Sequence, residues 1–167
     1  MVSVRSTVLV VEDDPATCGM IQDLLEAAGY LVETAPDGAM ALTYLAAGGI
    51  DVVVLDQMLP LVHGLELCRL IRGQRSDSYL PIIMVTALSG EPHRRNAVAA
   101  GADVYLTKPL DVTELLYIVD RWAAICQRRK AEREARIALM TEDRPAEQSD
   151  RGGWPAQIAP QAARRWS

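Results

Sequence analysis

The sequence lacks phenylalanine altogether, and aromatic residues make up only 5% of its 167 positions. It also lacks long apolar runs, since stretches such as Leu80 to Leu88 are far shorter than the roughly 18 residues that a membrane-spanning helix needs. No secretory signal is visible, because Glu12, Asp13 and Asp14 interrupt the N-terminal apolar stretch. With 50% hydrophobic and 23% charged residues, the composition is typical of one soluble globular domain. The sequence therefore predicts a cytoplasmic protein without a membrane partner.

Cysteine is scarce as well. The three cysteines, Cys18, Cys68 and Cys126, are odd in number and lie far apart in the sequence. This spacing excludes a disulfide framework and does not match a cysteine metal site. We expect three buried, reduced thiols.

Positive charge is scarce in the first part of the chain. Up to Gln127 there are 8 Lys and Arg against 16 Asp and Glu (8 − 16 = −8), whereas Arg128 onward has 9 against 6 (9 − 6 = +3). Because phosphate backbones are bound through clustered lysine and arginine, the acidic part argues against direct nucleic-acid binding. The two parts differ in composition, so we expect a boundary near Gln127.

Five short apolar runs rich in β-branched residues alternate with segments of helical period, which indicates an α/β fold with a mostly parallel sheet. The expected strands are Thr7–Val11, Tyr30–Thr34, Asp51–Leu55, Ile82–Val85 and Val104–Leu106. The expected helices begin at Asp14-Pro15, Pro36-Asp37-Gly38, Gly64, Glu91 and Asp111, and glycines end the first four at Gly29, Gly48, Gly73 and Gly101.

The last expected helix begins with Asp111 and Glu114, which resemble a capping box. The polar, helix-favouring segment 127–136 is expected to prolong this helix. From Thr141 the chain is rich in proline, glycine, glutamine and charge, which predicts disorder. The expected organisation is thus a domain over 1–127, a helical extension over 128–140 and a disordered tail over 141–167.

Polar residues stand where the expected strands end. Glu12 and Asp13 follow the first strand, Asp56 the third, Thr86 the fourth and Lys108 the fifth. Ligands of open parallel sheets bind beyond the carboxyl ends of the strands, so these side chains are expected to share one rim. Three neighbouring carboxylates repel one another unless a cation intervenes, and Mg²⁺ suits such a site. The alternative for the first two acids is a helix N-terminus whose dipole favours negative charge.

Lys108 is the only lysine in the first 127 residues, where every other cation is arginine. A compact ammonium suits a single phosphoryl or carboxylate oxygen better than a planar guanidinium does. Chance in an arginine-biased composition is the alternative explanation.

Four segments resemble the CheY-like receiver domain of two-component response regulators. They are Val8-Leu-Val-Val-Glu-Asp-Asp-Pro15, Leu55-Asp-Gln-Met-Leu-Pro60, Val85-Thr-Ala87 and Gly101-Ala-Asp-Val-Tyr-Leu-Thr-Lys-Pro109. The resemblance extends from about Thr7 to Gln127. It implies a doubly wound, flavodoxin-like (βα)5 sandwich, in which a five-stranded parallel sheet in the order 2-1-3-4-5 carries helices on both faces.

The resemblance also implies a role for each acidic residue. Asp56 would be the phosphoacceptor, its carboxylate attacking phosphorus to form an acyl phosphate. Mg²⁺ would be held by Asp13, by Asp56 and by the backbone carbonyl of Met58, with Glu12 acting through water. Only the carbonyl of Met58 is needed, so its apolar side chain is no objection.

The other matched residues imply phosphate binding and a switch. Lys108 and the Thr86 hydroxyl would bind phosphoryl oxygens. Because a phosphoryl group adds nearly two negative charges, Thr86 would move toward it and Tyr105 would turn inward. The fourth helix, fifth strand and fifth helix would then change as a partner-binding surface.

The implied partner is a histidine kinase or a phosphotransfer protein, and no external substrate is expected, so the protein is not an enzyme in the usual sense. A homodimer could form through the fourth helix, fifth strand and fifth helix, or through the extension. About 40 residues after Gln127 are too few for a typical DNA-binding output domain. The chain is therefore expected to be a stand-alone receiver, or the N-terminal part of a larger regulator with a kinase or cyclase output.

Three other protein classes fit less well. A phosphohydrolase similar to haloacid dehalogenases needs a second acid two residues after the nucleophile, where this chain has Met58. A pseudo-receiver should have lost part of the set of acids, threonine and lysine. A nucleotide-binding flavodoxin-like module should have a glycine-rich phosphate loop after the first strand, and none is present.

Overall fold

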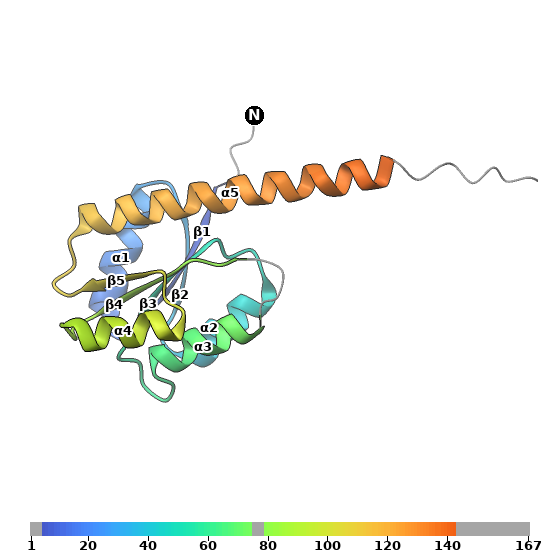
Figure 1. The fold of residues 1–167 in the computed structure, drawn as a ribbon. Helices are drawn as coiled ribbons and strands as arrows, with labels where there is room; N and C mark the ends of the chain where they lie inside the picture. The colour runs from blue at the N-terminus through green and yellow to red at the C-terminus, as the bar shows by residue number, and fades with distance from the viewer. Residues whose placement is uncertain (1–4, 75–78, 143–167) are drawn as a thin grey trace, which may run out of the picture.

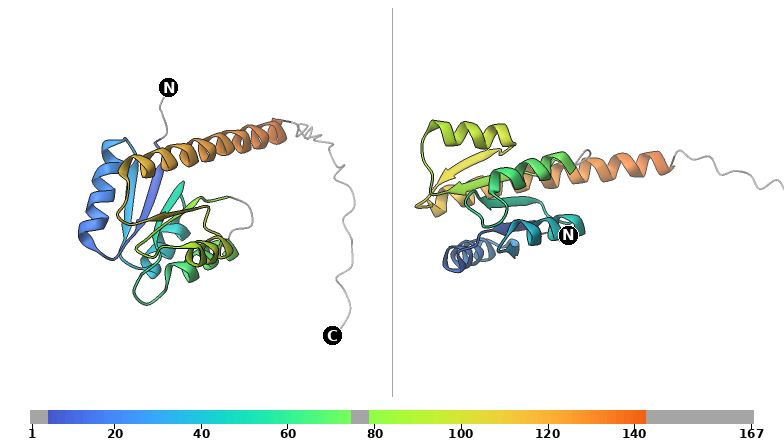
Figure 2. Two further views of the ribbon diagram at one scale, coloured as in Figure 1. Left: turned by 60° about the vertical axis from the view of Figure 1, so that its left-hand side comes forward. Right: turned by 90° about the horizontal axis from the view of Figure 1, so that it is seen from below.

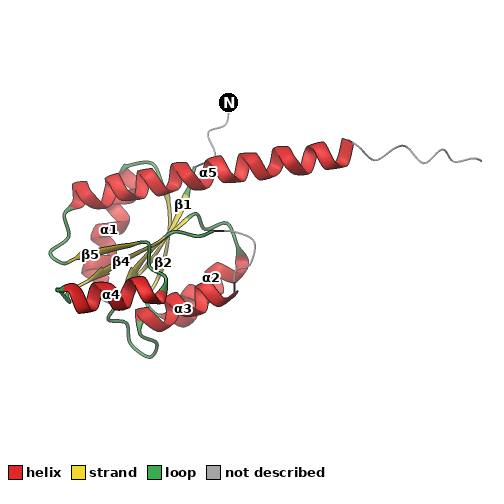
Figure 3. Cartoon of the chain, viewed as in Figure 1, coloured by secondary structure: helices red, strands yellow, loops and turns green. Residues whose placement is uncertain are grey.

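The computed structural model describes residues 5–74 and 79–142, which form a five-stranded parallel sheet between two layers of helices (Figures 1 and 3). The strands are β1 (Thr7–Val11), β2 (Leu31–Ala35), β3 (Val52–Asp56), β4 (Ile82–Thr86) and β5 (Val104–Thr107). The helices are α1 (Pro15–Ala27), α2 (Gly38–Ala47), α3 (Gly64–Gln74), α4 (Glu91–Ala100) and α5 (Val112–Glu142).

The strand order is β2-β1-β3-β4-β5, with every neighbouring pair parallel, which confirms the predicted fold. All strands therefore end on one side of the sheet, here called its carboxyl end, and begin on the other, its amino end. In the register, Val11 lies beside Leu55, Asp56 beside Val85, and Thr86 beside Thr107. This register places the ends of the three central strands side by side.

Two apolar cores cover the two faces of the sheet, because successive strand side chains point in opposite directions. Leu9 and Val11 of β1 pack in the core under α2, α3 and α4, whereas Val8 and Val10 pack in the core under α1 and α5. Both faces of β3 and β4 are completely buried. Because both faces of these strands are buried, every residue along them must be able to pack in a core, which explains their continuous apolar sequence.

Helix α5 is continuous over 31 residues and extends beyond the sheet (Figures 1 and 2). Its start is capped by the Asp111 carboxylate, which accepts hydrogen bonds from the backbone amides of Thr113 and Glu114 at 2.8 and 3.1 Å. Thr141 and Glu142, expected in a disordered tail, lie in this helix. The rest of the expected tail, 143–167, lies outside the described residues.

Several predicted boundaries were wrong. The fourth and fifth strands each end one residue later than expected, at Thr86 and Thr107. The second and third strands each begin and end one residue later than expected, so Asp51 precedes β3 and Asp56 is its last residue. Gly73 does not end α3, which continues to Gln74. Glycine ends a helix by adopting positive φ, as Gly101 does at 102° after α4, and Gly73 is not among the residues with positive φ.

The expectation of three buried, reduced thiols is confirmed for two cysteines and wrong for Cys18. All three cysteines are free thiols; Cys68 and Cys126 are buried, whereas Cys18 is only partly buried. Within residues 5–74 and 79–142, no helix has both the length and the apolar character needed to cross a membrane.

Candidate phosphoryl-acceptor site

The predicted site residues meet at the carboxyl end of the sheet. Asp56 is the last residue of β3 and Thr86 the last of β4, while Glu12 directly follows β1 and Lys108 directly follows β5. The strands bring these residues together from distant parts of the sequence. Glu12, Asp13 and Asp56 form an acidic cluster that Lys108 joins. Thr86 and Tyr105, the two predicted switch residues, form a separate pair of hydrogen bonds.

The acidic cluster consists of Glu12, Asp13 and Asp56. One carboxylate oxygen from each lies within 4.8 Å of the other two. Glu12 and Asp56 are only 4% and 5% exposed, whereas Asp13 faces solvent. Hard carboxylate oxygens with one side open to water match the ligands that Mg²⁺ prefers, since this ion keeps several of its waters. The residues therefore fit a magnesium ion.

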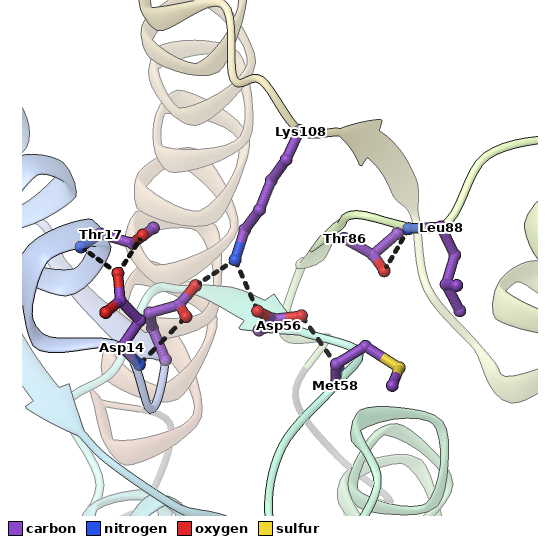
Figure 4. Close-up of polar contacts among 8 residues, drawn as sticks. Asp14, Thr17, Asp56, Met58, Thr86, Leu88 and Lys108 are labelled. Atoms are coloured by element: carbon purple, nitrogen blue, oxygen red, sulfur yellow. Dashed lines mark hydrogen bonds and ion pairs between the residues drawn. The ribbon is translucent and has the colours of Figure 1, made fainter.

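Lys108 lies between the two buried acids. Its Nζ is 2.6 Å from Oδ2 of Asp56 and 2.8 Å from Oε2 of Glu12. Figure 4 shows the Lys108 side chain extending to Asp56. Burial lowers the pKa of Lys108, but its hydrogen bonds and attraction to both acids outweigh burial and leave the pKa raised. The ammonium thus stays protonated at neutral pH. One positive charge serves three carboxylates, so the cluster keeps a negative surplus.

The pKa of Glu12 is raised, chiefly because its carboxylate is buried. Burial raises the pKa, the hydrogen bond from Lys108 lowers it, and repulsion by Asp56 raises it, with a raised pKa as the result. The other carboxylate oxygen of Glu12 accepts a hydrogen bond from the Asp14 backbone amide at 3.3 Å. Glu12 is thus fixed beside Asp56 at an electrostatic cost.

The loop after β3 fixes the second oxygen of Asp56. The backbone amide of Met58 donates to Oδ1 of Asp56 at 2.8 Å, while the Met58 side chain is half exposed. Gly64, the first residue of α3, packs so closely that an added Cβ would lie 2.2 Å from the Asp56 carbonyl oxygen and 2.7 Å from the Gln57 Cα. Only glycine permits this approach of α3 to the end of β3.

The two predicted switch residues, Thr86 and Tyr105, are both bonded to Leu88. The Thr86 hydroxyl is completely buried and accepts a hydrogen bond from the Leu88 amide at 3.1 Å. The Tyr105 hydroxyl donates to the Leu88 carbonyl at 2.9 Å, and burial raises its pKa, which keeps it protonated. Thr86 therefore turns toward Leu88 (Figure 4). Leu88 carried no signal in the sequence because it contributes only backbone atoms.

Two further features of the site lay beyond sequence reasoning. The Lys108–Pro109 peptide bond is cis. A groove beside the acidic cluster is lined by Gln57, Met58, His63 and His93, among others, which brings together both histidines of the chain. His93 was not singled out in the sequence, since a lone histidine on a polar helix is ordinarily a surface residue.

The profile of the response regulator receiver domain family matches residues 8–120, more than half of the chain. The chain belongs to this family. The acidic cluster of Glu12, Asp13 and Asp56 lies within the matched residues.

Curated relatives support the assignment over a longer segment. Response regulator MprA of Mycobacterium avium (strain 104) is 41% identical over 134 residues, which are 80% of this chain and 57% of MprA. Transcriptional regulatory protein TrcR of Mycobacterium tuberculosis (strain ATCC 25618 / H37Rv) is 36% identical over 157 residues, 91% of this chain and 59% of TrcR. The chain thus spans little more than half the length of the curated relatives it matches.

Solved structures of isolated receivers have the same fold. The receiver domain of Francisella response regulator 1452 is 31% identical, with a TM-score of 0.68 over 72% of this chain and 98% of that one. Chemotaxis protein CheY4 of Vibrio cholerae is 32% identical, with a TM-score of 0.67 over 71% and 98%. The BeF3-activated receiver domain of DrrB is 33% identical, with a TM-score of 0.64 over 71% and 97%.

Proposed function

We propose that this receiver accepts, in the cytoplasm, a phosphoryl group on Asp56 from a histidine kinase or a phosphotransfer protein. The observation that carries the proposal is the position of the Asp56 carboxylate, which contacts Lys108 on one side and lies against Glu12 and Asp13 on the other. A buried carboxylate beside other carboxylates and a single ammonium destabilises the folded protein. The same arrangement is well suited to bind a metal ion and a phosphoryl group.

In the proposed reaction, an Asp56 carboxylate oxygen forms a bond to phosphorus while the bond between phosphorus and the donor nitrogen breaks. Mg²⁺ bound by Asp13, Asp56 and the Met58 carbonyl, with Glu12 acting through water, would supply positive charge to the phosphoryl oxygens. Lys108 supplies a second positive charge, already held 2.6 Å from the nucleophile. The reaction uses no external substrate beyond the phosphodonor.

The proposed switch begins with the Thr86 hydroxyl. The Thr86 hydroxyl only accepts a hydrogen bond from the Leu88 amide, whereas a charged phosphoryl oxygen is a strong acceptor for the hydroxyl proton. Thr86 would therefore turn away from Leu88 and donate to the phosphoryl group. Tyr105, which holds the carbonyl of the same Leu88, would then lose its fixed partner and turn inward. The surface formed by α4, β5 and α5 would change as a result.

The output of the chain is also a proposal. The chain covers 57% of MprA and 59% of TrcR, which agrees with the receiver part of a larger regulator. We also propose a homodimer, formed through α4, β5 and α5 or through the end of α5. Light scattering with and without beryllofluoride tests the dimer, and an unchanged mass would contradict it.

The phosphoacceptor is tested with the full chain, Mg²⁺ and acetyl phosphate, and the product is measured by intact-mass spectrometry. Wild type is expected to gain one acid-labile phosphoryl group and Asp56→Asn none. The matched control is Asp51→Asn, because Asp51 is equally buried and lies at the other end of β3. Equal labelling of Asp56→Asn and wild type would show that Asp56 is not the acceptor.

A further inference from the structure

The part of α5 just beyond the family match is attached to the amino end of the sheet, opposite the acidic cluster. Lys130 Nζ lies 2.5 Å from Oδ1 of Asp51, whose side chain is only 3% exposed. The other carboxylate oxygen of Asp51 accepts a hydrogen bond from the Thr7 amide at 2.9 Å. Thr7 starts β1 and Asp51 directly precedes β3. Lys130 thus binds an acid that is built into the two central strands.

This contact matters because a buried carboxylate without a counter-charge is strongly destabilising. Within the described part of the chain, Lys130 is the only cation in an ion pair with Asp51. The lysine side chain is half exposed, so its own desolvation cost is small. The receiver body therefore depends on a residue of the extension to neutralise one of its buried acids.

A second contact is made by Arg129. Its guanidinium lies 5.0 Å from the centre of the Tyr79 ring, within the range of a cation–π interaction. The Tyr79 ring also contacts Trp122 of α5, with 5.9 Å between ring centres. Its hydroxyl donates to Asp103, which directly precedes β5. Arg129 thus rests on a tyrosine that is itself fixed to the sheet.

A third contact joins Gln127 to Ser6. The side-chain amide of Gln127 donates a hydrogen bond from Nε2 to the Ser6 hydroxyl at 3.0 Å. Residues 131–140 are all exposed, and α5 leaves the sheet there (Figure 2). Up to residue 140, the last buried residue of α5 is thus Cys126, and the contacts of Arg129 and Lys130 with the body are made by exposed or half-exposed side chains.

We propose that Gln127, Arg129 and Lys130 form a clamp that fixes the end of α5 as a rigid arm at the amino end of the sheet. An exposed helix of about a dozen residues is only marginally stable in water, so its order depends on an anchored first turn. The clamp supplies that turn. The clamp thus holds the exposed residues 131–140 in a defined direction relative to the sheet.

The test uses full-length variants, with melting temperature and amide hydrogen exchange as measurements. Lys130→Met is expected to lower the melting temperature by about 6 °C, because Asp51 keeps a buried charge without a partner. Adding Asp51→Asn should recover most of this loss, since an amide still accepts from the Thr7 backbone and carries no charge. The matched control Arg133→Met changes an exposed cation of the arm and should leave the melting temperature unchanged.

Hydrogen exchange distinguishes a clamp on the arm from an ion pair that stabilises only the body. Amides of residues 131–140 should exchange about tenfold faster in Lys130→Met than in Arg133→Met. Equal exchange in these two variants would overturn the proposal, even if Lys130→Met melts earlier. So would a double variant, Lys130→Met with Asp51→Asn, that is no more stable than Lys130→Met alone. Neither measurement depends on phosphorylation.

Discussion

The two ends of β3 carry the same kind of residue in different surroundings. Asp51 and Asp56 are 3% and 5% exposed, each accepts one backbone hydrogen bond, and each contacts a lysine from far along the chain. At the amino end, Asp51 has Lys130 as its ion-pair partner. At the carboxyl end, Asp56 shares Lys108 with Glu12, and Asp13 lies nearby.

The difference between the two ends separates a structural acid from a reactive one. A balanced pair of charges stabilises the junction of strands at the amino end. At the carboxyl end, three carboxylates are balanced by only one ammonium, so they repel one another in the folded state. Such a destabilising arrangement is retained only where the excess negative charge has a function. The surplus at the carboxyl end is what a divalent cation and a phosphoryl group together would use.

The largest expected effect comes from filling the space at the carboxyl end. Gly64→Ala should lower the free energy of unfolding by about 3 kcal/mol, because the new Cβ would meet the Asp56 backbone oxygen at 2.2 Å. Its control is Gly73→Ala near the other end of α3, where an added Cβ meets nothing within 4 Å. That change should raise stability by about 0.5–1 kcal/mol. Urea unfolding measures both, and a Gly64→Ala protein as stable as wild type would contradict the close packing.

Neutralising Asp51, which precedes β3, and Asp56, its last residue, should change the free energy of unfolding in opposite directions. In magnesium-free buffer, Asp56→Asn should raise the free energy of unfolding by about 1 kcal/mol, because it relieves repulsion among three acids. Asp51→Asn should lower it by about 0.5–1 kcal/mol, because it removes a balanced ion pair. Thermal unfolding monitored by circular dichroism measures both values. If the two variants shift stability in the same direction, the two ends do not differ in charge balance.

The smallest expected effect is a pH dependence at Glu12. Its pKa is raised above the ordinary value of 4.5, so the folded state holds the proton more tightly than the unfolded chain. The stability that this group contributes is therefore complete below pH 4.5 and is lost as the pH rises through the folded pKa. Melting temperatures of wild type relative to Glu12→Gln should fall across that range without Mg²⁺. A constant difference would contradict the electrostatic cost assigned to Glu12.

The residues at the carboxyl end of the sheet could be predicted from the sequence because they directly follow apolar strands. Periodicity located the strands to within one residue, and parallel strands must end together, so Asp56, Thr86 and Lys108 could be placed on one rim. The strand order and the roles came from the resemblance to receivers. Their roles in phosphoryl transfer stay predictions.

The amino end could not be predicted in the same way. Asp51 and Lys130 are 79 positions apart, and a lysine in a run of charges has the sequence signature of a solvated helix face. Tyr79 and Arg129 are also far apart in the sequence, and their contact depends on the path of α5 in the folded protein. The boundary expected at Gln127 was based on the change in composition, whereas contacts with the sheet continue to Lys130. Composition alone does not record which charged residues have buried partners.

The end of α5 has a mechanical consequence. Twelve helical residues follow Lys130, a length of about 18 Å at 1.5 Å per residue. A rotation of about 10° at Lys130 would therefore displace the far end of the helix by about 3 Å, roughly the width of one atom. Small adjustments where α5 meets the strands would be magnified at the helix end, at the place where the chain continues toward its remaining residues.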